Sequence, residues 1–215
     1  ELVAAAAAML QPGYRPGTLP ALMKTPHWDF LPLVEYRRWF ATLPWGVRRA
    51  VTDAWGEPEA SPWVAQRGGG AGFVIPRMQL GRMVVMPQPM RSESAAAHRD
   101  EKKLFHDTKM PLNHFYMAAY LWVRTRHRAD AIVHFGTHGT QEWTPGKERG
   151  LWAWDDPNIL VGNTPVVYPY IVDNIGEAVH VKRRGRGVIV SHQTPAFAPA
   201  GLSEEFVRIV DLIRE

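Results

Sequence analysis

The sequence of 215 residues contains no cysteine, so it can form no disulfide bond, thiolate metal site or cysteine nucleophile. A chain without cysteine suits a reducing compartment, and we expect a cytoplasmic location. No apolar run reaches the length that crosses a membrane, so we expect no membrane span. The start, ELVAAAAAML, lacks both the basic segment of a signal peptide and an initiator methionine. We therefore expect a piece of a longer chain.

A strong excess of one charge sign is also missing. The chain has 25 lysine and arginine residues against 21 aspartate and glutamate residues, a net charge of +4. A nucleic-acid-binding surface usually carries a denser basic face, so we expect no nucleic-acid partner. Hydrophobic residues make up 46% of the chain, which is enough to bury a core. The composition therefore predicts a globular domain.

The spacing of apolar residues divides the chain into two parts. Residues 31–44 and 45–58 each predict a helix that stops at proline or glycine, and residues 64–72 predict a loop. We therefore predict a helical extension with a linker over residues 1–70. From residue 71 to residue 215, short strands alternate with helices, which predicts an α/β core.

This core is expected to hold a mostly parallel sheet flanked by helices. Two short strands are predicted within residues 72–88, and one strand each within residues 129–136 and 187–195. The predicted helices span residues 111–127, 144–154, 174–185 and 203–215. Thr144 is placed as the N-cap of the second of these helices. Gln88, His134 and His192 then fall at the carboxyl ends of strands, where open α/β sheets bind ligands.

The stretch from Ala131 to Gly150, AIVHFGTHGTQEWTPGKERG, places His134, His138 and Glu142 at intervals of four residues. Imidazole and carboxylate side chains suit divalent ions such as cobalt, zinc or magnesium. A carboxylate beside a metal ion can also accept protons. We therefore predict a metal site formed by all three side chains, with Glu142 and His138 as catalytic groups. The alternative is a core histidine followed by a capped turn.

Two familiar motifs do not fit this stretch. The zinc-hydrolase motif H-E-x-x-H has a different order of residues. The pair Gly146 and Lys147 resembles the end of a phosphate-binding loop, but Gly139 lies too far upstream of it. Glu148 also stands where such a loop needs serine or threonine to bind magnesium. We therefore predict that this chain does not itself bind ATP.

A basic run ends the helix predicted over residues 174–185. It contains Lys182, Arg183, Arg184 and Arg186. Such a run suits an anion clamp for carboxylates or phosphates, or simply a basic C-terminus that complements the helix dipole. His114 begins another predicted helix, where the dipole favours the neutral imidazole that can act as a ligand. A histidine at a helix start is also common as a structural residue.

Two long segments resemble the large subunit of class I chelatases, a family with a cobaltochelatase and a magnesium chelatase branch. They are ADAIVHFGTHGTQEWTPGKERGL (residues 129–151) and VYPYIVDNIGEAVHVKRRGRGVIVSHQTPAFAPAGL (residues 167–202). The motif H-x-G-x-H-G-x-x-E-[WF]-x-P-G-K is long and specific, and the resemblance covers roughly residues 32–202. QEWTPGKERGLW and SHQTPAFAPAGL are closer to the cobaltochelatase (CobN) branch, whereas Thr137 is familiar in the magnesium branch.

The resemblance implies a metal chelatase, a ligase that forms nitrogen–metal bonds. Its substrate metal would be Co²⁺, inserted into the corrin ring of hydrogenobyrinic acid a,c-diamide in cobalamin biosynthesis. The alternative is Mg²⁺ inserted into protoporphyrin IX. An AAA+ ATPase and companion chelatase subunits would use the ATP. Glu142 matches the essential glutamate of the family. Substrate contacts are expected from Lys147, Glu177, Lys182, Arg183, Arg184, His192 and His114.

Two hypotheses from other classes stay open. The first is a tetrapyrrole-binding module that keeps the fold without catalysis. The second is a metal-dependent hydrolase that uses His134, His138 and Glu142 to activate water. Only a chelatase needs both a macrocycle and Glu142, so these two requirements separate the three hypotheses.

Overall fold

The computed structural model describes residues 3–4, 6–7, 9, 15–92, 107–135, 140–169, 175–190 and 204–214. Its α-helices are α2 (Leu19–Leu22), α3 (Leu33–Phe40), α4 (Trp45–Trp55), α6 (His114–Trp122), α7 (Asp156–Val161), α8 (Ile175–Arg184) and α9 (Glu204–Arg214). Its short 3₁₀-helices are η1 (Pro16–Thr18), η2 (Pro58–Ala60) and η5 (Gln141–Trp143), and η4 (Val123–His127) is a π-helical turn. Its strands are β1 (Trp28–Pro32), β2 (Val64–Arg67), β3 (Gly70–Pro76), β4 (Met78–Leu80), β5 (Met83–Val85), β6 (Ile132–Val133), β7 (Val166–Pro169) and β8 (Gly187–Val190).

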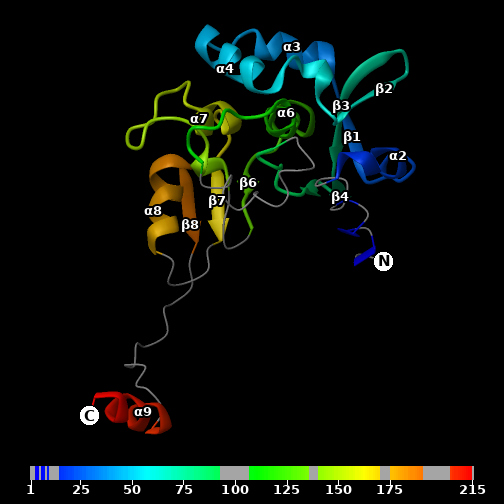
Figure 1. Cartoon of the computed structure of the whole chain (residues 1–215). Helices are drawn as coiled ribbons and strands as arrows, with labels where there is room; N and C mark the ends of the chain where they lie inside the picture. Colours follow the sequence, from blue (N-terminus) through cyan, green and yellow to red (C-terminus); the bar gives the residue numbers. More distant parts are fainter. Residues whose placement is uncertain are drawn as a thin grey trace.

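The described strands form three small sheets. Sheet A has the antiparallel order β1-β3-β2, and sheet B is the antiparallel hairpin β4-β5. Sheet C has the parallel order β6-β7-β8, and α8 connects β7 to β8 and lies against the sheet (Figure 1). An α/β fold with sheets and flanking helices is therefore confirmed, and sheet C is its parallel part.

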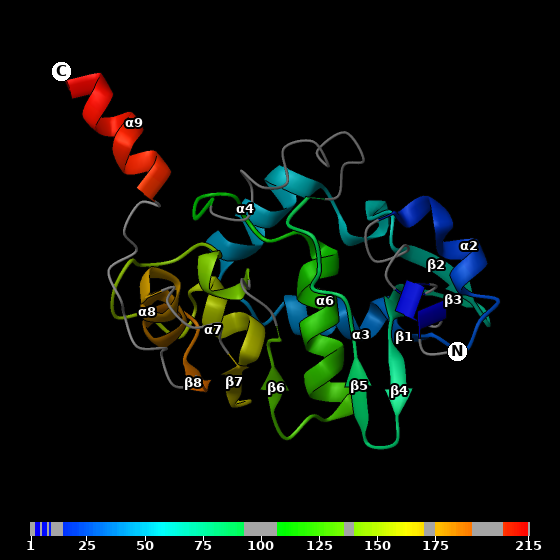
Figure 2. The same ribbon diagram turned by 90° about the horizontal axis from the view of Figure 1, so that it is seen from below.

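Helix α6 runs through the middle of the molecule. All nine of its residues are buried, and Figure 2 shows it between β6 on one side and β5 on the other. It begins where Asn113 caps it, because the Asn113 side chain accepts a hydrogen bond from the Tyr116 backbone N–H at 2.7 Å. A helix buried on every side can carry few polar groups, so each hydroxyl on α6 must find a partner inside the protein.

One hydrophobic core joins residues from both sides of position 70. Leu31, Tyr36 and Phe73 from the first half pack in the same cluster as Trp122 and Val166. Strand pairing also joins the two sides of position 70, because β3 lies between β1 and β2 in sheet A. The described helices α3 and α4 confirm the two helices predicted over residues 31–58. These helices cover one end of the molecule, above α6 and sheet A (Figure 1).

The predicted secondary structure is wrong for three segments. Residues 64–72, predicted as a loop, form β2 and the start of β3, with a tight turn at Gly68 and Gly69, whose φ angles are 55° and 86°. Residues 72–88 contain parts of three strands, and Gln88 follows an antiparallel hairpin and not a strand of the parallel sheet. Residues 144–154 form no helix, because Arg184 binds the backbone oxygens of this segment.

Helix α9 lies apart from the rest of the described structure in Figures 1 and 2. Several of its apolar side chains are exposed, namely Phe206, Val207, Ile209, Leu212 and Ile213. None of the helices in the described part of the chain combines the length and the hydropathy needed to cross a membrane.

Candidate functional site

His134 follows β6 directly, at the carboxyl end of an edge strand of sheet C. Its backbone N–H donates to the Val167 oxygen of β7 at 2.9 Å, which fixes its position on the sheet. The side chain is 8% exposed, and its Nε2 lies 3.0 Å from the Tyr120 hydroxyl on α6. Burial lowers the pKa of His134 to about 4. The imidazole is therefore neutral at pH 7, the form that binds metal ions.

The second ring nitrogen of His134, Nδ1, is buried and has no hydrogen-bond partner among the residues that the structure describes. The imidazole stands edge-on to two tyrosine rings, Tyr120 at 6.1 Å and Tyr168 at 5.7 Å between centroids. These two rings fix the plane of the imidazole. A neutral, oriented imidazole with one unbonded nitrogen fits a ligand for a divalent ion.

Glu142 lies in η5 and is 1% exposed. The Tyr168 hydroxyl lies 3.5 Å from Glu142 Oε1, at the outer limit of a hydrogen bond. Tyr168 therefore contacts both His134 and Glu142, and the structure brings these two predicted residues to one buried cluster. The backbone of Glu142 is held separately, because its oxygen accepts a hydrogen bond from Arg184 Nε at 2.7 Å.

A network of hydroxyl and amide groups lies beside His134. We call Gln88, Tyr116, Tyr120 and Thr140 the tyrosine network. Gln88 Nε2 lies 2.8 Å from the Tyr116 hydroxyl, 3.2 Å from the Tyr120 hydroxyl and 3.1 Å from Thr140 Oγ1. Tyr116 and Thr140 are also hydrogen-bonded to each other. Burial raises the pKa of Tyr116 to about 12 and that of Tyr120 well above its usual value, so both phenols stay neutral.

A cavity of about 1060 Å³ opens beside this network, and we call it the β5–β6 cavity. Residues 82–89, residues 127–135 and the last turns of α6 line it, and both His134 and Tyr120 reach its wall. Apolar side chains form much of its lining, and among them Met83, Val133 and Phe135 are 57%, 57% and 90% exposed. Pockets for flat organic ligands have this combination of apolar walls and a few oriented polar groups.

The predicted basic run lies elsewhere. Arg184 is 2% exposed and donates to the backbone oxygens of Glu142, Thr144, Gly146 and Lys147. Its guanidinium therefore holds the segment that follows η5, and it does not face the β5–β6 cavity. Lys182 and Arg183 are exposed on α8.

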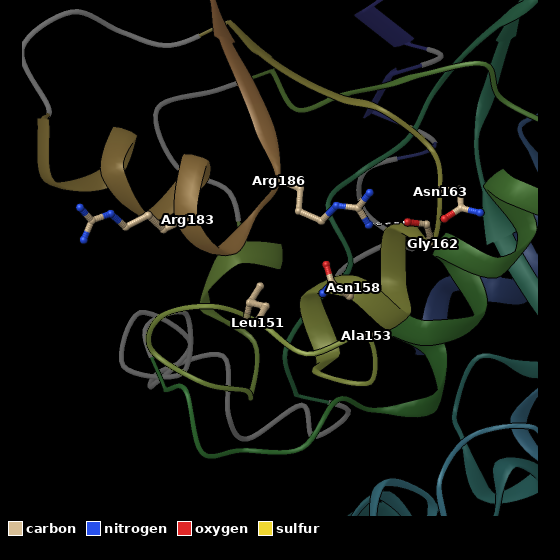
Figure 3. A pocket seen from close by; sticks show the side chains of 7 residues that line it. All are labelled: Leu151, Ala153, Asn158, Gly162, Asn163, Arg183 and Arg186. Carbon is tan, nitrogen blue, oxygen red and sulfur yellow. Dashed lines mark hydrogen bonds between the residues drawn. The ribbon is translucent and has the colours of Figure 1, made fainter.

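Arg183 and Arg186 line a different cavity, of about 440 Å³, together with the residues around the end of α7. This cavity lies at the amino ends of β7 and β8, whereas His134 lies at the carboxyl end of β6. Figure 3 shows the Arg186 guanidinium beside Gly162, whose oxygen it binds at 2.7 Å, while the Arg183 side chain extends away. The structure therefore separates this part of the basic run from His134 by the length of the sheet.

Two further predicted residues lie outside the cluster. His114 is fully buried in the core, where Nδ1 lies 2.7 Å from the Tyr36 hydroxyl and Nε2 lies 3.0 Å from the Gly56 oxygen. Both ring nitrogens are thus occupied, and burial lowers the pKa of His114. Lys147 is exposed, and its backbone N–H lies 3.3 Å from Asp155 Oδ2.

Three predicted site residues cannot be placed. His138 and His192 lie outside the described residues, and the side chain of Glu177 on α8 is not described. Within the part of the chain that is described, no three histidine, aspartate or glutamate side chains gather into a metal-binding group. His134 and Glu142 are therefore the predicted ligands that the structure places.

The buried tyrosines near His134 were missed by the sequence analysis. Tyr116 and Tyr120 lie four residues apart on a helix whose other residues are mostly apolar, so both hydroxyls fall on one buried face. Since buried hydroxyls are nearly always hydrogen-bonded, this spacing could have indicated a polar cluster. Tyr168 gave no such signal, because it lies on a strand between apolar residues.

Comparison with known proteins places these residues in context. A family model described as CobN/Magnesium Chelatase matches residues 5–215. The aerobic cobaltochelatase subunit CobN of Pseudomonas aeruginosa is 38% identical over 184 residues, which are 86% of this chain and 14% of that protein. A magnesium-chelatase subunit of Rhodobacter capsulatus is 37% identical over 159 residues, which are 74% of this chain and 13% of that protein.

A solved structure has the same fold. The catalytic subunit of cobaltochelatase from Mycobacterium tuberculosis superimposes with a TM-score of 0.69 at 34% identity, covering 93% of this chain and 17% of that one. The chain thus spans about a seventh of the length of the curated relatives that it matches. The match of the family model over almost every residue shows that the chain belongs to the CobN/magnesium chelatase family.

Proposed function

We propose that this chain is the metal- and tetrapyrrole-handling region of a chelatase large subunit that inserts Co²⁺ into a corrin ring, hydrogenobyrinic acid a,c-diamide. One observation carries the proposal. His134 reaches the wall of the β5–β6 cavity, and Tyr168 links it to the buried carboxylate of Glu142. His134, proposed as a metal ligand, lines a cavity that suits a flat, largely apolar molecule, and Glu142, proposed as the proton acceptor, lies behind Tyr168.

Metal insertion makes two chemical demands, and the site can meet both. The hydrated ion must exchange water for protein ligands that release it again, and imidazole and carboxylate groups bind Co²⁺ or Mg²⁺ in this way. The ring must also lose its inner N–H protons, two from a porphyrin and one from a corrin, as its four nitrogens bind the metal. Glu142 is proposed to accept each such proton and to pass it to solvent. His138 is proposed as the second imidazole ligand.

The β5–β6 cavity supports the choice of a macrocycle as substrate. Its volume is about 1060 Å³, at the upper end of the usual range for small-molecule pockets. The exposed side chains of Met83, Val133 and Phe135 give a face of the macrocycle apolar surface to pack on. Burial of these three side chains under the macrocycle would then contribute favourable free energy to substrate binding.

The magnesium branch supplies the second candidate, insertion of Mg²⁺ into protoporphyrin IX. The identity to the Rhodobacter magnesium-chelatase subunit, 37%, is almost the same as that to the Pseudomonas cobaltochelatase subunit, 38%. The fold comparison with the Mycobacterium tuberculosis cobaltochelatase favours cobalt. Titrating the full-length subunit with both macrocycles, followed by tryptophan quenching, separates the two, since the true substrate binds more tightly.

Energy for insertion is proposed to come from partner subunits. The Gly146–Lys147 segment lacks the spacing of a phosphate-binding loop, and the relatives are named as subunits of larger enzymes. An AAA+ ATPase and a companion chelatase subunit would hydrolyse the ATP. Assays of insertion therefore need the full-length subunit together with its partners.

The decisive variant is Glu142→Gln in the full-length subunit. Because glutamine cannot take a proton from the ring, we expect the insertion rate to fall by about 100-fold or more. Tetrapyrrole affinity should change little, since Glu142 does not line the β5–β6 cavity. The matched control is Glu148→Gln, the same substitution at an exposed glutamate six residues further on, and it should keep the wild-type rate.

The same experiment tests the rival hypotheses. A non-catalytic binding module would bind tetrapyrrole, but its function would not depend on Glu142. A metal-dependent hydrolase would lose activity with Glu142→Gln yet would need no macrocycle. Wild-type insertion rates in Glu142→Gln would remove this residue from the mechanism.

A further inference from the structure

We propose that Tyr120 is a positioning residue for metal delivery, which binds His134 through Nε2 and thereby presents Nδ1 as the atom that takes the divalent ion. The inference rests on the proposed function, because it assigns a task within the same site. It adds a residue on another element, α6, whose hydroxyl contacts no metal and acts only through the imidazole.

The geometry around His134 supports this assignment. The Tyr120 hydroxyl lies 3.0 Å from Nε2, and the two rings meet at an interplanar angle of 88°. The Tyr168 ring also meets the imidazole, at an interplanar angle of 89°. The imidazole is therefore held in one plane, and of its two nitrogens only Nδ1 has no partner among the described residues.

The hydrogen-bond chemistry of a phenol explains how Tyr120 can serve the metal-bound state. A phenol can donate a hydrogen bond to a bare Nε2, or accept one from Nε2–H. In the second arrangement Nδ1 carries no proton, so its lone pair is available for a divalent ion. Metal-binding histidines commonly donate their other N–H to an oxygen in this way, and that contact fixes the tautomer.

Tyr120 is itself held in place by its own neighbours. Its ring stacks on Tyr116 with centroids 5.4 Å apart, and its hydroxyl lies 3.2 Å from Gln88 Nε2. The residue is 5% exposed on a helix that is buried along its whole length. The imidazole is thus positioned by a rigid element, which is what a transient metal ligand needs if it is to release the ion without losing its orientation.

Tyr116 provides a matched control. It lies one turn earlier on α6, is also buried and belongs to the same stacked pair, but its hydroxyl bonds Thr140 and Gln88 instead of His134. Replacing either tyrosine with phenylalanine removes one buried hydroxyl from the same network. A difference between the two variants therefore reports the contact with His134, and not a general loss of packing.

The test uses the full-length subunit, with Co²⁺ affinity measured by equilibrium dialysis and insertion kinetics measured with the partner subunits present. Tyr120→Phe should weaken Co²⁺ binding and raise the KM for Co²⁺ by about 10- to 100-fold. The KM for tetrapyrrole should stay within about twofold of wild type, because phenylalanine keeps the aromatic ring that reaches the cavity wall. Tyr116→Phe should stay within about twofold for both substrates.

A double-mutant cycle makes the test specific. In a His134→Ala background, Tyr120→Phe should cause no further loss of Co²⁺ affinity, because the residue through which it acts is gone. Equal effects of Tyr120→Phe and Tyr116→Phe, or a full effect of Tyr120→Phe without His134, would overturn the inference. So would a parallel loss of tetrapyrrole and Co²⁺ binding in Tyr120→Phe, since a positioning role requires the two to separate.

Failure of this inference is distinguishable from failure of the proposed function. If Glu142→Gln abolishes insertion while the two tyrosine variants behave alike, the chelatase site stands and Tyr120 has only a structural role. If the wild-type subunit with its partners neither binds tetrapyrrole nor inserts a metal, the proposed function itself fails.

Discussion

Arg184 carries a buried guanidinium that binds backbone oxygens in the segment after Glu142. Its Nε and both Nη atoms reach the oxygens of Glu142, Thr144, Gly146 and Lys147. Burial lowers its pKa, although the carboxylates of Asp155 and Glu148 oppose that shift. The sequence suggested an anion clamp at this position. In the structure, the guanidinium instead holds the backbone of Glu142, the proposed proton acceptor, and of the segment that follows it.

We therefore predict that Arg184→Ala lowers the free energy of unfolding by about 3 kcal/mol, because several buried carbonyl groups lose a charged donor. The adjacent Arg183→Ala should change it by less than about 0.5 kcal/mol, since Arg183 is exposed. Urea denaturation followed by tryptophan fluorescence measures both. Similar midpoints for the two variants would show that these hydrogen bonds contribute little.

At the same scale, the structure brings together two of the residues predicted for the site. His134 and Glu142 were singled out because their residue types at regular spacing after a strand indicate metal chemistry, and their role in a metal site stays a prediction. Tyr120 and Tyr168 were not singled out, since tyrosine in an apolar helix or strand is usual in a core. Their roles depend on which segments meet in space, and residue 120 is brought to residue 134 only by the tertiary packing of α6 against sheet C.

Helices were predicted better than strands. The helices α3, α4, α6, α8 and α9 all fall within predicted segments, since helical periodicity is a local property of the sequence. The predicted helix over residues 144–154 failed because its backbone groups bind side chains. Asp155 accepts from the backbone N–H groups of Lys147 and Trp152, and Gly150 has a φ angle of 61°. The periodicity of apolar residues in the sequence does not indicate such contacts.

The strands of sheet A depend on partners that are distant in the chain. β1 pairs with β3 over the register Trp28 to Pro76 and Pro32 to Gly72. β1 has five residues, ends in a proline and leads directly into a helix. Its residues show no clear alternation of apolar and polar side chains. The pairing that makes it a strand therefore could not be read from its own residues.

Gly72 offers a test of this packing at the scale of the element. A Cβ atom on Gly72 would lie 2.5 Å from the Leu31 backbone oxygen and 2.5 Å from the Phe30 ring. We expect Gly72→Ala to lower the free energy of unfolding by about 1 to 3 kcal/mol, because β1 must move away. Thermal unfolding of the variant and the wild type measures the difference.

The control is Gly70→Ala in the same strand, where a Cβ atom would meet nothing within 4 Å. This variant should be neutral or more stable by up to about 1 kcal/mol, since alanine restricts the unfolded chain more than glycine does. A Gly72→Ala variant as stable as Gly70→Ala would mean that sheet A tolerates the separation of β1 from β3.

The pH dependence of stability is a property of the whole molecule, and Asp156 contributes to it. Burial raises the pKa of Asp156 to about 7, although the nearby Arg91 charge and the Leu112 backbone N–H act against the shift. The folded state therefore holds a proton that the unfolded state releases near pH 4. This contribution to stability is complete below about pH 4 and is lost as the pH rises to 7.

We predict that Asp156→Asn abolishes this loss of stability between pH 4 and pH 7. Its free energy of unfolding, relative to wild type, should rise with pH between 4 and 7 by about 1 kcal/mol per pH unit. The exposed Asp53→Asn on α4 serves as the control and should show no such trend. Urea midpoints at several pH values give the measurement, and a constant difference across this range would show that Asp156 stays ionised in the fold.

The single core that joins Leu19 to Val166 has a consequence for how the chain is made. Roughly 150 residues separate these two members of the cluster. At a synthesis rate of about 5 to 20 residues per second, the first waits roughly 7 to 30 s for the second. During that time α3, β1 and the β2–β3 hairpin have left the ribosome with their apolar faces uncovered. Nascent chains stalled before residue 114 should therefore recruit chaperones, and chains that include α6 and β7 should release them.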